Sequence, residues 1–353
     1  MKIVIKKLKS DQYIDNLEVR NFKCFKQLSI TNIGQVNLIG GKNNVGKTAF
    51  LEALELFASS NKASDLFISL YRVLRRRQDI NQSRYFEMDF IYDDKSETSI
   101  SSLSKSCSLI RSVGNAGNID IFKDESDTLP TEILTAVVNN NEEKIPIEYI
   151  NRSDRFIQQR RSTKNNLIYI SASKIQEQDI AISFGILTEL FMEDFLNESL
   201  SLFDKNILEL KQISKERGIV LKLKLKNKKS LVLLSSLGEG INRYIAILCA
   251  IWANKEGVLL IDEIENGIHY TNYKKLWQII FKASVDANCQ IFITTHSKEC
   301  ITAFNDVQFE DKNCHTQYFE FYKNLKTDLI TATERDKEQL RYELNNEGRV
   351  RGE

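Results

Sequence analysis

Two glycines, a lysine and a threonine stand at fixed spacing near the start of this 353-residue chain. Residues 41–48 read Gly-Lys-Asn-Asn-Val-Gly-Lys-Thr, which matches the G-x-x-x-x-G-K-[ST] pattern of a Walker A phosphate loop. The glycines let the backbone wrap closely around phosphate oxygens, the lysine brings positive charge, and the threonine hydroxyl is a Mg²⁺ ligand. We therefore expect ATP and Mg²⁺ to bind through Gly41, Asn43, Asn44, Gly46, Lys47 and Thr48, with Thr48 on the metal and Lys47 also catalytic.

Two later apolar runs end in residues that suit phosphate chemistry. Residues 258–261 are Val-Leu-Leu-Ile, and Asp262 and Glu263 follow directly, as in a Walker B strand. We expect Asp262 to hold Mg²⁺ and Glu263 to act as the general base on the attacking water. Residues 290–294 form a second such run, and His296 comes two residues later. A lone histidine is usually structural, but one at the carboxyl edge of a core strand predicts a γ-phosphate contact.

The segment 235–240, Ser-Ser-Leu-Gly-Glu-Gly, precedes a helix that we predict over 241–254. Ser236 is a candidate cap for that helix, and the free N–H groups and positive dipole end of its first turn would face an anion. Ser236, Gly238 and Glu239, at the start of this helix, are therefore a candidate anion site. The alternative for so short a string is a helix-capping loop and nothing more.

The elements around these motifs predict an α/β fold with a parallel or mixed core sheet. Strands are expected at 17–19, 27–30, 36–39, 167–171, 219–225, 230–234, 258–261, 290–294, 316–322 and 329–333, and a helix at 65–77. Alternating runs at 86–92, 98–103, 107–111, 119–123 and 144–149 indicate an antiparallel meander, with a polar loop or exposed helix at 151–166. Helical spacing dominates 175–217. The predicted division is an ATPase head from 1–60 and 218–353, an inserted helix and meander at 61–166, and a core strand with a helical subdomain at 167–217.

Composition excludes several classes of protein. The net charge is +1, so any contact with nucleic acid must come from local patches. The six cysteines form no C-x-x-C pair, which argues against zinc and favours buried thiols in a reducing cytoplasm. The first nine residues lack a signal-peptide core, and the longest apolar run, 245–253, is too short to span a membrane. We expect a cytoplasmic protein that does not enter a membrane.

Taken together, the motifs resemble an ABC-type ATPase of the SMC/RecF/OLD branch. The resemblance rests on Walker A, the S-x-G-E signature at 236–239, Walker B, the Thr-His-Ser run at 295–297 and the opening segment at 17–25. The runs 170–174 and 262–269 are similar to stand-alone OLD-like ATPases, relatives of which serve in the PARIS and Septu antiphage systems. The usual signature is L-S-G-G, from which Ser235 and Leu237 depart, and only Gln176 and Gln178 are candidates for the Q-loop glutamine.

The resemblance implies an ATP-sandwiched homodimer, or a higher oligomer, in which Ser236 and Gly238 contact the γ-phosphate held by the other subunit and residues 265–269 form a D-loop at the interface. It also implies a slow, regulatory ATPase that acts in antiphage defence as sensor or scaffold for a separate effector such as a nuclease. The alternatives are a RecF-like repair ATPase that binds DNA directly and a transporter subunit. The 188 residues between Thr48 and Ser236 disfavour the transporter. Basic clusters at 75–77, 152–161 and 222–229 are candidate DNA contacts or simply solvated faces.

Overall fold

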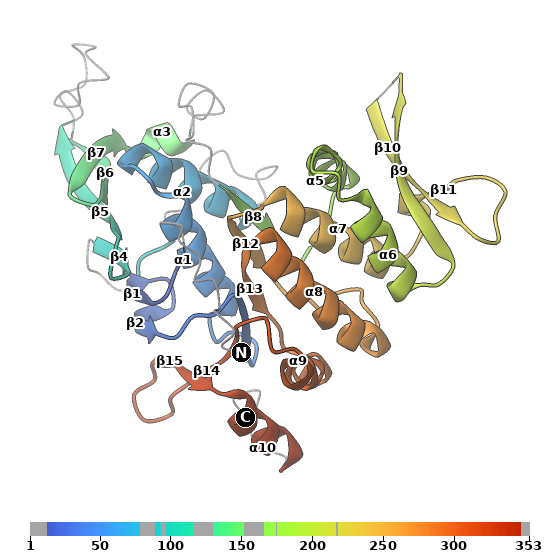
Figure 1. Cartoon of the computed structure of the whole chain (residues 1–353). Coiled ribbons are helices and arrows are strands. Elements are labelled where there is room, and N and C mark those ends of the chain that lie inside the picture. Colours follow the sequence, from blue (N-terminus) through green and yellow to red (C-terminus); the bar gives the residue numbers. More distant parts are fainter. Residues whose placement is uncertain are drawn as a thin grey trace.

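A computed structural model describes residues 13–77, 89–92, 97–115, 130–151, 166–173, 175–216 and 218–346. Within these ranges the chain forms three sheets flanked by helices, a mixed α/β architecture (Figure 1). The predicted runs at 119–123 and 152–165, most of that at 86–92, and Lys174 lie outside the described residues. The predicted domain boundaries remain a prediction.

The central sheet has six strands in the order β15-β14-β3-β13-β12-β8. Five of them run parallel, and β15 is the antiparallel edge. Their bounds are β3 Val36–Gly41, β8 Leu167–Ile170, β12 Val258–Ile261, β13 Gln290–Thr294, β14 Thr316–Lys323 and β15 Ile330–Arg335. Strands β3, β12 and β13 are buried along their full length, as apolar runs covered on both faces require. The three strands that end in predicted site residues are therefore neighbours.

Helices cover both faces of this sheet. One face packs against α1 (Lys47–Ser59) and α2 (Ala63–Arg77), and the other against α7 (Glu239–Ala253), α8 (Tyr273–Ala287) and α9 (Lys298–Glu310). Alternate residues of one strand serve the two cores: Leu260 belongs to the first and Leu259 to the second. The short helix α10 (Lys337–Asn345) packs on α9 at the C-terminal end (Figure 1).

A second, antiparallel sheet has the order β2-β1-β4-β5-β6-β7. Its strands are β1 Leu17–Phe22, β2 Phe25–Ile30, β4 Glu97–Ser101, β5 Ser106–Asn115, β6 Pro130–Val138 and β7 Asn141–Pro146, followed by the one-turn helix α3, Ile147–Asn151. The predicted meander is thus confirmed at β4, β5 and β7, while β6 had no predicted counterpart. Strand β1 pairs with β4, so the N-terminal hairpin and the inserted strands form one continuous sheet.

The segment after β8 differs in part from the expected helical run. Helices α5 (Glu177–Glu189) and α6 (Glu193–Phe203) form as predicted, but β9 (Ile207–Lys215) is a strand. It pairs with β10 (Gly218–Leu225), which pairs with the two-residue β11 (Val232–Leu233), so the predicted strands at 219–225 and 230–234 belong to a separate three-stranded sheet. The alternating burial of β10 explains this pairing, because Leu221 and Leu223 face the core. Among the described residues, we find no helix with the length and apolarity that a membrane crossing requires.

Candidate nucleotide site

The Walker A segment runs from the end of β3 to the start of α1. Gly41 and Gly46 have φ angles of 144° and 83°, in a region that residues with side chains rarely adopt. A Cβ atom on Gly41 would lie 2.3 Å from the carbonyl oxygen of Phe321, and one on Gly46 would lie 2.6 Å from the Sγ of Cys24. Both glycines are therefore required by backbone geometry and by packing, which places the first free N–H groups of α1 at the cavity.

Lys47 is the first residue of α1 and is only 8% exposed. Its Nζ donates hydrogen bonds of 2.7 Å to the carbonyl oxygens of Gly41 and Lys42, so the ammonium group closes the loop on itself. Burial lowers the pKa of Lys47, while the carboxylates of Glu265, Glu263 and Asp262 oppose that shift. The predicted lysine thus stands as a desolvated cation beside three acidic side chains.

Asp262 lies where three strands converge. Thr48 Oγ1 is 3.1 Å from Asp262 Oδ2, and Thr294 Oγ1 donates a 2.6 Å hydrogen bond to Asp262 Oδ1. The hydroxyl of Tyr169, at the end of β8, is 3.4 Å from Asp262 Oδ2. Carboxylate and hydroxyl oxygens are the ligands that Mg²⁺ prefers. The meeting of Thr48 and Asp262 therefore fits the predicted metal pair.

Glu263 is held in an unusual backbone conformation. Its φ angle is 49°, in the left-handed region that is uncommon for residues other than glycine. The backbone N–H of Glu263 donates a 2.8 Å hydrogen bond to Thr294 Oγ1, and Asn266 Nδ2 donates a 2.9 Å hydrogen bond to Glu263 Oε2. The side chain is 35% exposed and lines the cavity. This is the placement expected of a base that must reach a water molecule.

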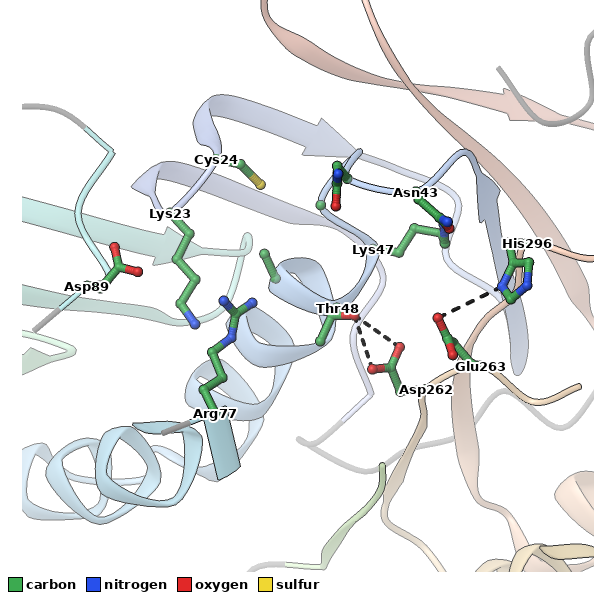
Figure 2. A pocket seen from close by; sticks show the side chains of 13 residues that line it. Lys23, Cys24, Asn43, Lys47, Thr48, Arg77, Asp89, Asp262, Glu263 and His296 are labelled. Atoms are coloured by element: carbon green, nitrogen blue, oxygen red, sulfur yellow. Dashed lines mark hydrogen bonds and ion pairs between the residues drawn. The ribbon is translucent and has the colours of Figure 1, made fainter. Parts of the chain in front are cut away.

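His296 follows β13 and faces Glu263 across the cavity mouth, with 3.9 Å between its Nδ1 and Glu263 Oε1 (Figure 2). Its nearer partner is Glu265, which had been expected only in an interface loop. Glu265 is 8% exposed, and its side chain is directed toward His296 of the same chain. The remaining residues of that expected loop include Gly267 and His269, which are exposed.

The side chains of Lys47, Thr48, Asp262, Glu263 and His296 line one cavity of about 720 Å³ (Figure 2). Asn43 and Asn44, which the Walker A motif predicts to bind nucleotide, also line it. Its other end is lined by residues that the motifs did not indicate: Lys23, Cys24, Arg77 and Asp89. Lys23 Nζ and Arg77 Nε each lie 2.6 Å from an oxygen of Glu52, a carboxylate that is 1% exposed. At this end of the cavity two cations, Lys23 and Arg77, therefore stand against two carboxylates, those of Glu52 and Asp89, and their formal charges balance.

The predicted signature residues lie elsewhere. Ser236, Gly238 and Glu239 are exposed and are not among the residues that line the cavity. The prediction that Ser236 caps α7 is wrong: the N-cap is Gly238, with no side-chain cap, and Ser236 ends a short 3₁₀ turn. The exposed first turn of α7 packs on the loop after Walker B, because a Cβ on Gly240 would lie 2.3 Å from the carbonyl oxygen of Gly267.

Four contributors to the site had no sequence signal of their own: Tyr169, Arg243, Glu265 and Thr294. Tyr169, Arg243 and Thr294 contact Asp262 or Glu263, and Glu265 contacts His296; only the tertiary structure reveals these contacts. Of the cysteines, five are buried as expected, whereas Cys24 is half-buried beside the cavity. Burial raises the pKa of the Cys24 thiol, so it is not primed as a thiolate.

Comparison with known proteins agrees with this geometry. The chain is 28% identical over 338 residues to an "ATP/GTP phosphatase" of Helicobacter pylori, covering 86% of this chain and 90% of that protein. Its fold is similar to the SMC head in a crystal structure of that head bound to the C-winged helix domain of ScpA (TM-score 0.52, 13% identity, 92% and 99% of the two chains). It is also similar to an Smc head with an extended coiled coil bound to the C-terminal domain of ScpA, derived from Pyrococcus furiosus (TM-score 0.50, 11% identity, 95% and 99%).

These two structural likenesses establish the fold: a P-loop head of the SMC type, as the resemblance had implied. A model of a protein family matches residues 36–301, which include the Walker A loop, the signature segment, Walker B and His296. The chain belongs to that family, AAA_21, described as "AAA domain, putative AbiEii toxin, Type IV TA system".

Proposed function

We propose that this protein is a slow ATPase that uses Mg²⁺, pairs through ATP and reports its nucleotide state to a separate effector. The observation that carries the proposal is the convergence of Lys47, Thr48, Asp262, Glu263 and His296 on one cavity, from the start of α1 and from the ends of β12 and β13. The printed name of the Helicobacter pylori relative, a nucleotide phosphatase, supports hydrolysis.

Each residue has a chemical role in this proposal. Lys47 and the first N–H groups of α1 bind the terminal phosphates, and Asn43 and Asn44 flank them. Thr48 and Asp262 would hold the Mg²⁺, which neutralises charge on the phosphate oxygens when bound. Glu263 takes the proton of the attacking water, and His296 donates a hydrogen bond toward the γ-phosphate.

Pairing of two chains follows from the position of the signature segment. Ser236, Gly238 and Glu239 are exposed and outside their own cavity, yet the N-terminus of α7 is a natural anion site. In a C₂ dimer each chain would offer this turn to the phosphate bound by the other. The proposal is therefore an ATP-dependent homodimer, either alone or as the unit of a larger oligomer.

A partner surface is supported by exposed apolar side chains on and after α5. Ile182, Ile186 and Leu190 recur at four-residue spacing and are 59%, 38% and 36% exposed, and Phe191 is 89% exposed. Such a stripe is unusual on a chain surface that meets only water. We propose that a separate effector, such as a nuclease of an antiphage system, binds here and reads head closure.

The decisive experiment measures phosphate release from ATP by the purified chain with Mg²⁺. We expect slow turnover by the wild type and a loss of at least ~100-fold in Glu263→Gln, the usual loss for a positioned base. Equal rates would remove Glu263 from the mechanism. For the partner, Ile182→Asp should abolish co-purification of the effector while turnover is unchanged, and Val285→Asp, on exposed apolar surface of α8, is the matched control.

A second candidate function, direct DNA binding as in RecF-like ATPases, is favoured by one observation. The segment 204–229 holds nine basic and three acidic residues in a chain of net charge +1. Lys222 of β10 stands directly opposite Lys211 of β9, and Lys211 is itself paired with Glu209 at 3.3 Å. Lys224, Lys226, Lys228 and Lys229 continue this exposed basic surface.

Duplex DNA binding over a range of salt concentrations tests this candidate. Lys222→Gln/Lys224→Gln should lower the slope of log K against log salt by about 2, close to one counterion per lost contact. Lys255→Gln/Lys275→Gln, at exposed sites outside this sheet, should leave it unchanged. No measurable affinity of the wild type for DNA at low salt would leave the surface a solvated face.

A further inference from the structure

Arg243, in the second turn of α7, is a buried cation that hydrogen-bonds to main-chain carbonyls. It is 4% exposed, and within the described ranges no carboxylate oxygen lies within 4.0 Å of its guanidinium group. Nη1 donates a 3.1 Å hydrogen bond to the carbonyl oxygen of Ser171. Nη2 donates to the carbonyl oxygens of Asp262 and, at 2.8 Å, Glu263. One side chain thus joins the signature helix to the ends of β8 and β12.

The two Walker B carbonyls can reach the same nitrogen because the chain turns sharply at Glu263. The left-handed φ of 49° at Glu263 directs both carbonyl oxygens to Arg243 on one side. On the other side its N–H is held by Thr294. Strained backbone of this kind persists only where surrounding contacts over-determine it, and it clusters at functional sites. The side chains of Arg243 and Thr294 thus hydrogen-bond to the main chain of Glu263, the predicted general base, at its carbonyl oxygen and its N–H group.

Arg243 also stands at a fixed offset from the signature segment. Gly238, the N-cap of α7, is five residues earlier, and Gly240 packs against the backbone of Gly267. A helix moves as a rigid rod over this length. Any displacement of the exposed first turn therefore reaches Arg243, and through it the peptide groups of Asp262 and Glu263.

We propose that Arg243 is a positioning residue that fixes the backbone of Glu263 and couples the orientation of its carboxylate to the position of α7. Arg243 does not line the nucleotide cavity, so this coupling acts on hydrolysis and not on nucleotide affinity. The inference rests on the proposed ATPase function. It adds a route by which a phosphate bound at the first turn of α7 changes the orientation of the Glu263 carboxylate in the same chain.

The variant Arg243→Lys tests the coupling, because an ammonium group lacks the fork that reaches three carbonyls. We expect kcat for ATP to fall at least tenfold while the Kd for nucleotide stays within twofold. Arg335→Lys is the matched control: it changes a mostly buried arginine of β15 that is paired with Glu320 of β14, four strands along the sheet from β12, and should change neither value.

A double-variant cycle separates positioning from general stability. If Arg243 acts through Glu263, the rate of Arg243→Lys/Glu263→Gln equals that of Glu263→Gln alone. Losses that multiply would overturn the inference, as would full turnover by Arg243→Lys while Glu263→Gln is inactive. A wild type without ATPase activity would instead overturn the proposed function and this inference with it.

Gly240→Ala provides a second, independent perturbation should Arg243→Lys fail to fold. Its added methyl group meets the Gly267 carbonyl and moves the first turn of α7 without altering Arg243. The proposal expects lower kcat, unchanged nucleotide Kd and no further loss in the Glu263→Gln background. Unchanged kcat in folded Gly240→Ala would show that α7 and Glu263 are not coupled.

Discussion

The Glu265 carboxylate contacts His296 at two points: its Oε1 accepts a 2.7 Å hydrogen bond from the backbone N–H of His296 and lies 3.1 Å from Nδ1 of the imidazole ring. His296 itself is 46% exposed at the side chain, whereas the Glu265 side chain is 7% exposed. A buried carboxylate thus sets the orientation of an exposed ring. Its second oxygen, Oε2, has no hydrogen-bond partner among the described residues.

Removing the Glu265 carboxylate should free the imidazole ring of His296 to change its orientation. Glu265→Ala is expected to lower kcat by about 10- to 100-fold through loss of a positioned group, with a smaller change in KM. Glu265→Gln keeps an oxygen acceptor for the backbone N–H and should retain more activity. Steady-state kinetics of the two variants checks this, and equal losses would mean that charge rather than orientation matters.

Lys47→Ala should weaken ATP binding by at least about 100-fold, since it removes the cation that neutralises the terminal phosphates. The same substitution should not lower the stability of the folded protein. Burial lowers the pKa of Lys47, which means that desolvating its charge opposes folding. We expect a free energy of unfolding equal to or above that of the wild type, measured in denaturant beside calorimetric ATP titration. A clear loss of stability would show that the loop needs the lysine to fold.

Ser236→Arg should leave ATP binding intact and prevent ATP-dependent pairing. The bulky side chain would stand on the exposed turn that the proposal offers to the other chain's phosphate. Light scattering of Glu263→Gln with ATP, compared with the same protein carrying Ser236→Arg, gives the masses directly. The same mass for both, with and without ATP, would contradict the sandwich.

Thr294→Val removes one hydroxyl that serves both Walker B residues. The 0% exposed Thr294 then no longer donates to Asp262 or accepts from Glu263, leaving buried polar groups unmatched. We expect a loss of about 1–3 kcal/mol in the free energy of unfolding together with reduced turnover. Thr294→Ser retains the hydroxyl and serves as the control; chemical denaturation should place it near the wild type.

The purified chain with ATP and Mg²⁺ should not cleave plasmid DNA or tRNA. Across the residues that the structure describes, no group of three or more His, Cys, Asp and Glu side chains is placed to hold a metal ion. Of the acidic residues that line the cavity, Asp262 and Glu263 serve the proposed hydrolysis, and Asp89 lies at the other end with Lys23 and Arg77. Metal-dependent cleavage that survives Lys47→Ala and Glu263→Gln would reveal a separate active site.

The sequence predicted best what short-range patterns encode. The strands of the central sheet and the order of motifs were foreseeable because each buried parallel strand is a continuous apolar run that ends at the site, as Val258–Ile261 shows. The sequence predicts a helix over the range of β9 because its mixture of apolar and charged residues fits the helical period as well as the strand period. Only its pairing with β10 identifies it as a strand. The roles of Tyr169, Arg243 and Glu265 depend on contacts between distant segments, which no local pattern can reveal.

The position of β3 has a consequence for the order in which the chain matures. Val36 pairs with Ile291 on one side and Thr316 on the other, so β3, the strand that leads into the phosphate loop, has no neighbour in the central sheet until β13 has been synthesised and lacks its second neighbour until β14 has followed. Contacts of such sequence separation form slowly and leave apolar strand edges exposed meanwhile. We therefore expect a nascent chain that stops before β14 to bind nucleotide weakly and to expose an unpaired edge of β3 that favours aggregation.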